Sequence, residues 1–307
     1  MEKQLNSKKT FWTLKRTGYV FSAALVALPM LDFIVFYVIV NAGSIFAAFF
    51  DDVTGKFSLI HFENVFASFS DFGSGDSLWV CLKNTMIYWG AGFVTIPICI
   101  LLTYFLYKRI VGHNAFRFIF FLPSIISGLV WVTAWKEMTS MQGLLGQFMN
   151  AIGKPMATSI YKNAETTTIS LVFYGWWLGL ASGMLYYYSA MSRIPVSVLE
   201  AAKIDGCTPF GEFKDIVLPL IGPTVGTLLT LNFAGILGST GPILLFISDG
   251  LAGISTLSFR IYHIMLQNPT GSIGFVSALG FLMTMVSLPI AFGARAITNK
   301  FFPAYEY

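Results

Sequence analysis

Six long apolar stretches constrain the fold of this chain more than any other feature of its sequence. A helix that crosses a bilayer needs about 20 predominantly apolar residues. Six segments qualify, at roughly 18–40, 85–106, 117–135, 168–190, 217–247 and 273–294. Only 11% of the 307 residues are charged, against about 25% in ordinary soluble domains. The sequence therefore predicts an all-α, polytopic membrane protein with six transmembrane helices.

The positions of Lys and Arg predict the orientation of these spans. Cytoplasmic loops carry an excess of positive residues. The segment before the first span is basic, the loop after that span is mainly acidic, and the loop after the second span is basic again, with Lys108, Arg109 and Arg117. We therefore expect a cytoplasmic N-terminus and, with six spans, a cytoplasmic C-terminus.

The chain is predicted to be one transmembrane domain with short flanking segments. Residues 1–17 are expected to be a basic cytoplasmic N-terminus and residues 301–307 a cytoplasmic tail. Between them, residues 18–300 are expected to form the single transmembrane domain, with an external loop at 41–84 and a cytoplasmic loop at 191–216. The first apolar stretch is longer than the core of a signal peptide, so we interpret it as a retained anchor. The fifth is interrupted by Gly and Pro, which predicts a kinked or re-entrant piece.

The cytoplasmic loop contains the sequence EAAKIDG, which is unusually polar for this chain. Ser197 and Glu200 match the S-x-x-E capping box, and Gly206 is suited to a left-handed helix end. The pattern predicts a two-turn helix over residues 198–205. A second helix is expected to begin at Thr208 and to be interrupted at Pro219.

A helix of two turns is marginal in water and needs a surface to pack on. Val198, Ala201, Ala202 and Asp205 share one face by their spacing. Their small side chains permit close approach. The residues alone leave two interpretations open: the helix packs on its own bundle, or it docks on a partner protein.

The segment from Glu200 to Thr224, EAAKIDGCTPFGEFKDIVLPLIGPT, resembles the EAA loop of ABC importer permeases, the inner-membrane components of binding-protein-dependent transport systems. The matching positions are Glu200, Ala201, Ala202, Gly206, Ile216, Leu218 and Pro219. The Asp205–Gly206 pair is similar to the carbohydrate branch, whereas Cys207 departs from the usual Ala. The resemblance extends over roughly residues 80–300 and is weakest around Thr240-Gly241-Pro242.

This resemblance implies the partners and the location of the protein. The EAA helix is expected to dock on a cytoplasmic ABC ATPase dimer, with Glu200 and Asp205 as polar contacts. A second six-helix permease subunit (a heterodimer is favoured over a homodimer), an extracytoplasmic solute-binding protein and the lipid bilayer of a bacterial-type plasma membrane complete the system. No nucleic acid is expected, because the positive residues form no single patch. The chain itself is expected to hold no cofactor, since ATP and Mg would bind the ATPase.

Candidates for a solute path come from the apolar spans. Sugars bind through aromatic faces and hydrogen-bonding side chains, so we consider Trp131, Tyr174, Trp177 and Asn232, each of which could instead face lipid or pack. Asp32 is a candidate because an acid within a span is costly, or it is structural near the outer end. Gly175, Gly179 and Gly183 form a small-residue face that favours helix packing over solute contact.

The expected function is therefore that of a permease subunit, not an enzyme. No G-x-x-x-x-G-K-[ST] motif, metal-ligand cluster or catalytic nucleophile motif is present in the sequence. The resemblance implies ATP-driven import of a sugar, such as an oligosaccharide, polyol or glycoside. A non-sugar solute such as glycerol phosphate or a polyamine is one alternative, and an ion-coupled secondary transporter is another.

Overall fold

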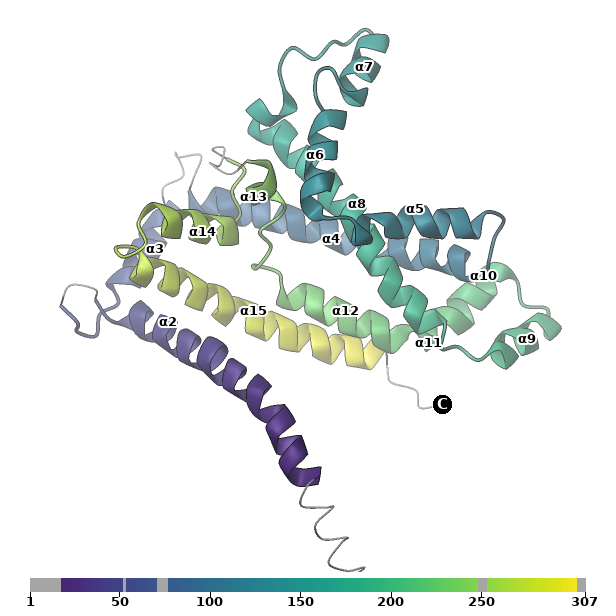
Figure 1. Cartoon of the computed structure of the whole chain (residues 1–307), viewed down its shortest axis with the longest axis horizontal. Coiled ribbons are helices and arrows are strands. Elements are labelled where there is room, and N and C mark those ends of the chain that lie inside the picture. Colours follow the sequence, from purple (N-terminus) through teal and green to yellow (C-terminus); the bar gives the residue numbers. More distant parts are fainter. Residues whose placement is uncertain (1–17, 52–53, 71–76, 248–252, 303–307) are drawn as a thin grey trace, which may run out of the picture.

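The computed structural model describes residues 18–51, 54–70, 77–247 and 253–302, which fold into helices joined by short turns (Figure 1). Four single helices are long and apolar enough to cross a bilayer: Gly18–Phe49, α4 (Leu78–Tyr107), α8 (Ala164–Met191) and α15 (Ile273–Phe301). Two bent helix pairs also qualify and raise the total to six. The predicted all-α, polytopic class is confirmed.

The first of these helices is longer than predicted. It includes a π-helical stretch, η1 (Phe33–Ile39), and α2 (Val40–Phe49). Asn41 and Ser44 do not end it, because their side chains donate to Tyr37 O (2.6 Å) and Val40 O (3.1 Å) within the helix. The predicted external segment 41–84 thus begins as helix, contains α3 (Ile60–Ser70) and ends inside α4.

The third span is not the single helix expected over 117–135. It consists of α5 (His113–Ile125) and α6 (Gly128–Met138), which meet at 109°. Ile126 and Ser127 between them have ψ angles of 142° and 136°, so the helical hydrogen bonds cannot continue. After α6 the chain forms α7 (Leu144–Ala151) and the 3₁₀ turn η2 (Ile160–Lys162). Figure 1 shows α6 and α7 projecting from the other helices.

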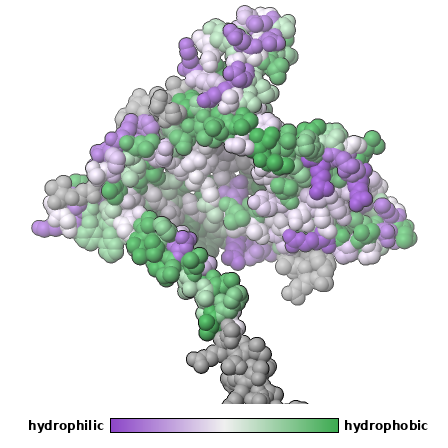
Figure 2. Space-filling model, in the orientation of Figure 1, coloured by the Kyte–Doolittle hydropathy of each residue, from purple (hydrophilic) through white to green (hydrophobic). Residues whose placement is uncertain are grey.

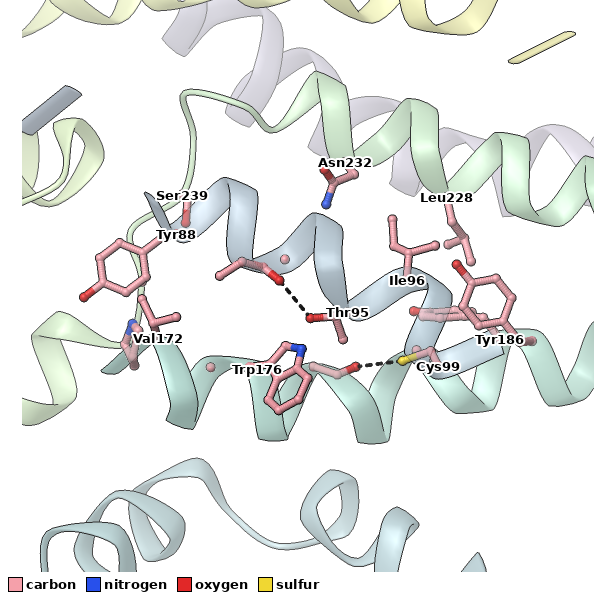
Figure 3. A pocket seen from close by; sticks show the side chains of 18 residues that line it. Tyr88, Thr95, Ile96, Cys99, Val172, Trp176, Tyr186, Leu228, Asn232 and Ser239 are labelled. Atoms are coloured by element: carbon pink, nitrogen blue, oxygen red, sulfur yellow. Dashed lines mark hydrogen bonds between the residues drawn. The ribbon is translucent and has the colours of Figure 1, made fainter. Parts of the chain in front are cut away.

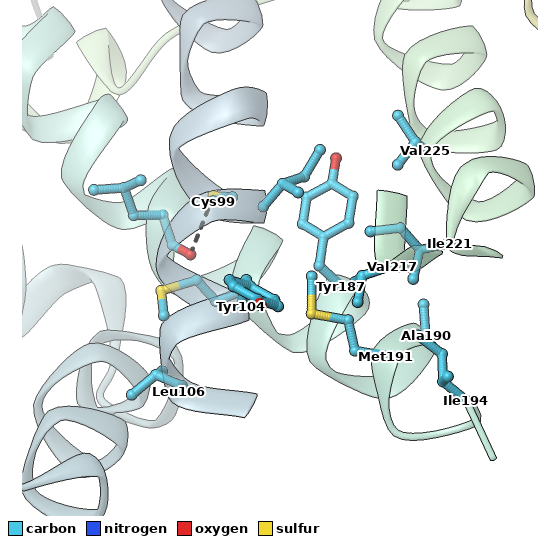
Figure 4. Packing of buried hydrophobic residues seen from close by; sticks show 13 residues of the cluster. Cys99, Tyr104, Leu106, Tyr187, Ala190, Met191, Ile194, Val217, Ile221 and Val225 are labelled. Atoms are coloured by element: carbon cyan, nitrogen blue, oxygen red, sulfur yellow. Dashed lines mark hydrogen bonds between the residues drawn. The ribbon is translucent and has the colours of Figure 1, made fainter. Parts of the chain in front are cut away.

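Helices α4 and α8 pack closely through the predicted glycine face. A Cβ on Gly183 would lie 2.7 Å from Cys99 Sγ, and one on Gly179 would lie 3.7 Å from Thr95 Cγ2. Only a residue without a side chain fits at Gly183. These contacts continue into a buried cluster that includes Tyr104, Tyr187, Val217 and Ile221 (Figure 4).

The fifth span is broken, as predicted, but at a different residue. Short helices α10 (Pro209–Gly211), η3 (Glu212–Val217) and α11 (Leu218–Leu220) run on to Leu220, and α12 (Gly222–Ala234) follows at 66°. Pro219 does not interrupt the first part, contrary to expectation. The π-helix η3 pairs the Leu218 N–H with Phe213 O, five residues back, and this wider turn accommodates a proline that lacks an N–H.

The opposite end of the bundle has its own core. There α2, α3, α4, α15 and α14 (Leu257–Gln267) share a buried cluster. The short helix α13 (Ile243–Phe246) packs against α6. Figure 2 shows hydrophobic residues along the N-terminal helix and over the body, with hydrophilic residues near α10 and on the α7 projection. An apolar surface of this kind is suited to lipid.

Candidate functional site

The EAA segment forms α9 (Val196–Ile204), which begins two residues before the predicted helix. Pro195 is the N-cap residue, and no side chain caps this end, so the predicted capping box of Ser197 and Glu200 does not form. Pro195 holds an extended conformation (φ −60°, ψ 134°) directly after the buried Ile194. This anchor sets the start of the helix, because proline fixes φ and needs no N–H partner there.

The end of α9 is built as the sequence predicts. Gly206 has a φ of +78°, and its N–H donates to Lys203 O (3.1 Å) while the Cys207 N–H donates to Ala202 O (3.0 Å). This pair of bonds is the Schellman motif. Thr208 then caps the following helix, since its Oγ1 accepts from the Gly211 N–H at 3.2 Å. The two helices are therefore joined by a short, hydrogen-bonded turn.

The exposed face of α9 differs from the predicted contact face at one residue, Ala202. Ala202 is buried within the chain, whereas Ala201 and Asp205 are exposed. Glu200 is exposed as well. Ile204 and Phe210 are large apolar side chains that are 86% and 73% exposed. Both lie next to the short turn between α9 and α10, so the turn carries two large exposed apolar side chains.

The remaining EAA positions lie along the helix that leads into α12. Ile216 and Leu218 are half-buried, and Pro219 is exposed. Val217 between them is fully buried in the cluster of Figure 4. We call the segment Pro209–Leu220, which comprises α10, η3 and α11, the arm. The arm connects the exposed α9 to a wall of the bundle.

A cavity of about 350 Å³ lies between α4, α8, α12 and residues 239–242 (Figure 3). Aromatic side chains and glycines form much of its wall, including Tyr88, Trp176, Tyr186, Gly175 and Gly179. None of its 18 lining residues, all within the described part of the chain, is Asp, Glu, Lys, Arg or His. Figure 3 shows Thr95 and Asn232 on facing helices across this space.

Three buried polar atoms in this cavity wall have no hydrogen-bond partner in the described structure. They are Tyr88 Oη, Trp176 Nε1 and Asn232 Oδ1. Buried polar atoms normally have partners, because an unpaired one costs about 1–3 kcal/mol. One of these atoms can only donate, one can only accept, and the tyrosine hydroxyl can do both.

The predicted path residues do not all lie together. Asn232 lines the cavity, but Trp131, Tyr174 and Trp177 do not. These three belong to an aromatic cluster with Trp135 and Phe246, in which the Trp131 and Trp177 rings are 4.6 Å apart and the Tyr174 and Phe246 rings 4.9 Å apart. Tyr174 is buried and its hydroxyl donates to Gly128 O at 3.3 Å. The cluster joins α6, α8 and α13.

Sequence reasoning missed Tyr88 and Trp176. Trp176 directly follows Gly175, the first residue of the glycine face, and Tyr88 lies near the start of the second predicted span, 85–106. The Tyr88 ring also packs on Gly241, where a Cβ would lie 3.3 Å from the ring and φ is +58°. Their positions in apolar spans made both residues possible members of a cavity wall. The sequence alone did not show that they line the same cavity.

Asp32 lies at the middle of its helix rather than near an end. It is the fifteenth of the 32 residues from Gly18 to Phe49, and its side chain is exposed. No residue of the most apolar 18-residue window of this helix is buried inside the chain. Asp32 is therefore separate from the cavity.

Comparisons with known proteins agree with this architecture. The chain is 27% identical to a probable ABC transporter permease protein of Bacillus subtilis (strain 168), YesP, over 88% of this chain and 86% of that protein. It is 24% identical to the arabinooligosaccharides transport system permease protein AraP of the same organism, over 97% and 94% of the two chains. The sn-glycerol-3-phosphate permease protein UgpA of Shigella dysenteriae is 28% identical over 66% of this chain and 68% of its own length.

The fold is also that of a solved transporter. A chain of a bacterial ABC transporter involved in import of the acidic polysaccharide alginate superimposes with a TM-score of 0.77 at 21% identity, covering 94% of this chain and 98% of that one. The model of the family described as "Binding-protein-dependent transport system inner membrane component" matches residues 95–303. The chain therefore belongs to this family, as a multi-pass, non-catalytic permease subunit of an ABC importer in the inner membrane.

Proposed function

We propose that this permease subunit moves an uncharged sugar, an oligosaccharide or a related polyol or glycoside, through the cavity between α4, α8 and α12. The observation that carries this proposal is that Tyr88, Trp176 and Asn232 line one aromatic-walled space, and that each has a buried polar atom (Oη, Nε1 and Oδ1) without a hydrogen-bond partner in the described structure. Ligand sites are typically apolar and aromatic, with a few polar groups that fix orientation. A sugar hydroxyl both donates and accepts, so sugar hydroxyls complement all three atoms.

The absence of charge in the cavity wall favours a neutral solute over the alternatives. A phosphate or carboxylate would enter a space where none of the 18 described lining residues is cationic, and burying an unpaired charge is far more costly than burying a hydroxyl. A polyamine meets the same difficulty, because no lining residue of this described cavity is acidic. Among the named relatives, the arabinooligosaccharide permease therefore fits this wall better than the glycerol-3-phosphate permease.

Energy for transport comes, in this proposal, from a dimer of ATPase subunits that bind ATP and Mg and dock on α9. The exposed Ile204 and Phe210 supply apolar contacts, and the exposed Glu200, Ala201 and Asp205 supply small and polar ones. Ala202, Gly206, Ile216, Leu218 and Pro219 act indirectly, because they fix α9 to the bundle or shape the turn and helix that follow it. An importer is favoured over an ion-coupled transporter by the family to which the chain belongs.

Two further partners complete the proposed importer. A second permease subunit covers the exposed apolar face of the first helix and closes the cavity from its open side, and a heterodimer is favoured. An extracytoplasmic binding protein delivers the sugar, in keeping with the family description.

The test removes the unpaired polar atoms of two cavity-lining residues. Tyr88→Phe deletes one unpaired atom with little loss of apolar contact. Trp176→Phe deletes the unpaired Nε1 together with part of the ring, and Trp177→Phe, on the neighbouring residue outside the cavity, is the matched control for that loss. ATP-driven sugar uptake by the co-purified complex in proteoliposomes should fall about two- to tenfold in the first two variants. Equal uptake by all three variants contradicts a role of these atoms in the solute path.

A second measurement addresses the class of solute. The wild-type complex, with its binding protein, is offered neutral oligosaccharides, uronic acid oligosaccharides and glycerol 3-phosphate at equal concentration. Uptake of the neutral class alone agrees with the uncharged cavity wall. Preferential uptake of either anion overturns the assignment to neutral sugars but leaves the importer itself intact.

A further inference from the structure

A buried ion pair fastens the arm that carries α9 to the end of α4. Lys108 Nζ lies 2.7 Å from Glu212 Oε1 and 2.8 Å from Oε2, so both oxygens of the carboxylate are bound. Glu212 is only 3% exposed. Removing a carboxylate from water costs several kcal/mol unless it is well paired, and Lys108 provides that pairing.

Tyr104 adds a second attachment one turn earlier on α4. Its hydroxyl donates to Pro209 O at 2.9 Å, and its ring centroid lies 4.9 Å from that of Phe213. Residues four apart lie on the same face of a helix. Tyr104 and Lys108 therefore bind Pro209 and Glu212, which lie on one turn of α10 and η3. We call Tyr104, Lys108, Pro209 and Glu212 the clasp.

The position of the clasp links two walls of the cavity. Helix α4 provides Tyr88, Thr95 and Cys99 to one wall, and α12, which continues the arm after Ile221, provides Leu228 and Asn232 to another. The clasp joins the cytoplasmic ends of these two walls. At about 1.5 Å per residue, Thr95 and Lys108 are roughly 20 Å apart along α4.

We propose that Lys108 and Glu212 are positioning residues that make α4 move together with the arm when α9 is displaced. Without the pair, the arm can shift α12 while α4 stays behind, so displacement of α9 no longer reshapes both cavity walls. This inference rests on the proposed function, in which an ATPase displaces α9. Loss of the pair then leaves ATP hydrolysis running with little solute import.

The test compares solute imported per ATP hydrolysed by the co-purified complex in proteoliposomes. Glu212→Gln is the first variant, because it removes the buried charge and leaves Lys108, whose side chain is a quarter exposed, able to reach water. The double variant Lys108→Met, Glu212→Leu removes both charges, a change that buried pairs often tolerate. Lys214→Met and Asp215→Asn are matched controls at exposed positions of the same helix.

Both clasp variants should lower import per ATP by about fivefold or more, and the exchanged pair Lys108→Glu, Glu212→Lys should restore it to within about twofold of wild type. The controls should match wild type. Unchanged import per ATP in the assembled variants overturns the inference. So does a defect confined to the amount of assembled complex, or a failure of all three variants to assemble, because either result assigns the pair to stability alone. If the wild-type complex shows no ATP-driven uptake, the proposed function fails instead.

Discussion

At the scale of single residues, glycines determine how closely some of the helices approach one another, because they have no side chain. His61 on α3 is buried, its Nε2 lies 3.1 Å from Phe50 O, and its ring occupies the space where a Cβ on Gly274 of α15 would be. The imidazole thus joins three segments at the end of the bundle opposite α9. Any side chain at Gly274 must displace the ring or separate the two helices.

We expect Gly274→Ala to destabilise the protein by about 1–3 kcal/mol, because it overpacks this contact. Gly280→Ala on the same helix is the matched control, since no atom lies within 4 Å of the position of its Cβ. Thermal unfolding in detergent should show a lower midpoint for the first variant only. Equal midpoints would mean that His61 moves aside at no cost.

The sequence predicts the role of a site residue where local chemistry determines that role. It fails where tertiary contacts determine which way a side chain faces. Gly206 follows from the need for a left-handed conformation at a helix end, and its φ of +78° confirms it. Asn232 follows from a polar residue in an apolar span, and it lines the cavity. Trp176 and Trp177 cannot be separated in this way, because adjacent tryptophans in an apolar helix give no sign of which one faces the cavity.

At the scale of elements, the existence of helices was predictable and their breaks were less so. The start of α9 moves to Val196 because a buried Ile194 and Pro195 anchor it, a tertiary effect that the capping pattern of Ser197 does not include. The turn between α5 and α6 and the π-helix η3 are likewise invisible to hydropathy. Apolar length identifies a span, but it does not show whether that span is straight.

The caps of α9 give a prediction that separates the two ends of this helix. Gly206→Ala forces a Cβ into a left-handed conformation and should cost about 1–2 kcal/mol, with Asn intermediate because it tolerates that conformation. Ser197→Ala should change little, since Ser197 caps nothing in the structure. ATPase binding, measured by co-purification, should fall in the order wild type, Gly206→Asn, Gly206→Ala. A loss in Ser197→Ala equal to that in Gly206→Ala contradicts this account.

At the scale of the whole molecule, the proposed importer pairs this chain with a second permease subunit. The helix Gly18–Phe49 packs on α15 only through its last part, and Figure 1 shows the rest leaving the body. Asp32 lies in that part, exposed and at mid-helix. A carboxylate that faced lipid there would cost about 3 kcal/mol, so we expect the second permease subunit to cover it.

Replacing Asp32 tests this expectation by the sign of the effect. Asp32→Leu makes the helix more apolar, which favours insertion of the single chain. If the partner subunit binds the carboxylate, the same change should lower the yield of the two-permease complex by about fivefold or more. If Asp32 faces lipid, the yield should stay equal or rise. The measurement is co-purification of the two subunits, normalised to the amount of this chain in the membrane.

Asn41→Leu is the matched control for this measurement, because Asn41 is an exposed polar residue of the same helix whose amide already donates to Tyr37 O. It should leave the yield of the complex unchanged, since Asn41 carries no charge and its amide already donates within the helix. A fall in yield for Asp32→Leu but not for Asn41→Leu therefore reports a specific contact of the carboxylate rather than a general response to greater hydrophobicity. A lower yield of the complex for both variants would indicate that assembly depends on the polarity of the whole helix. Asp32 would then have no special role in assembly.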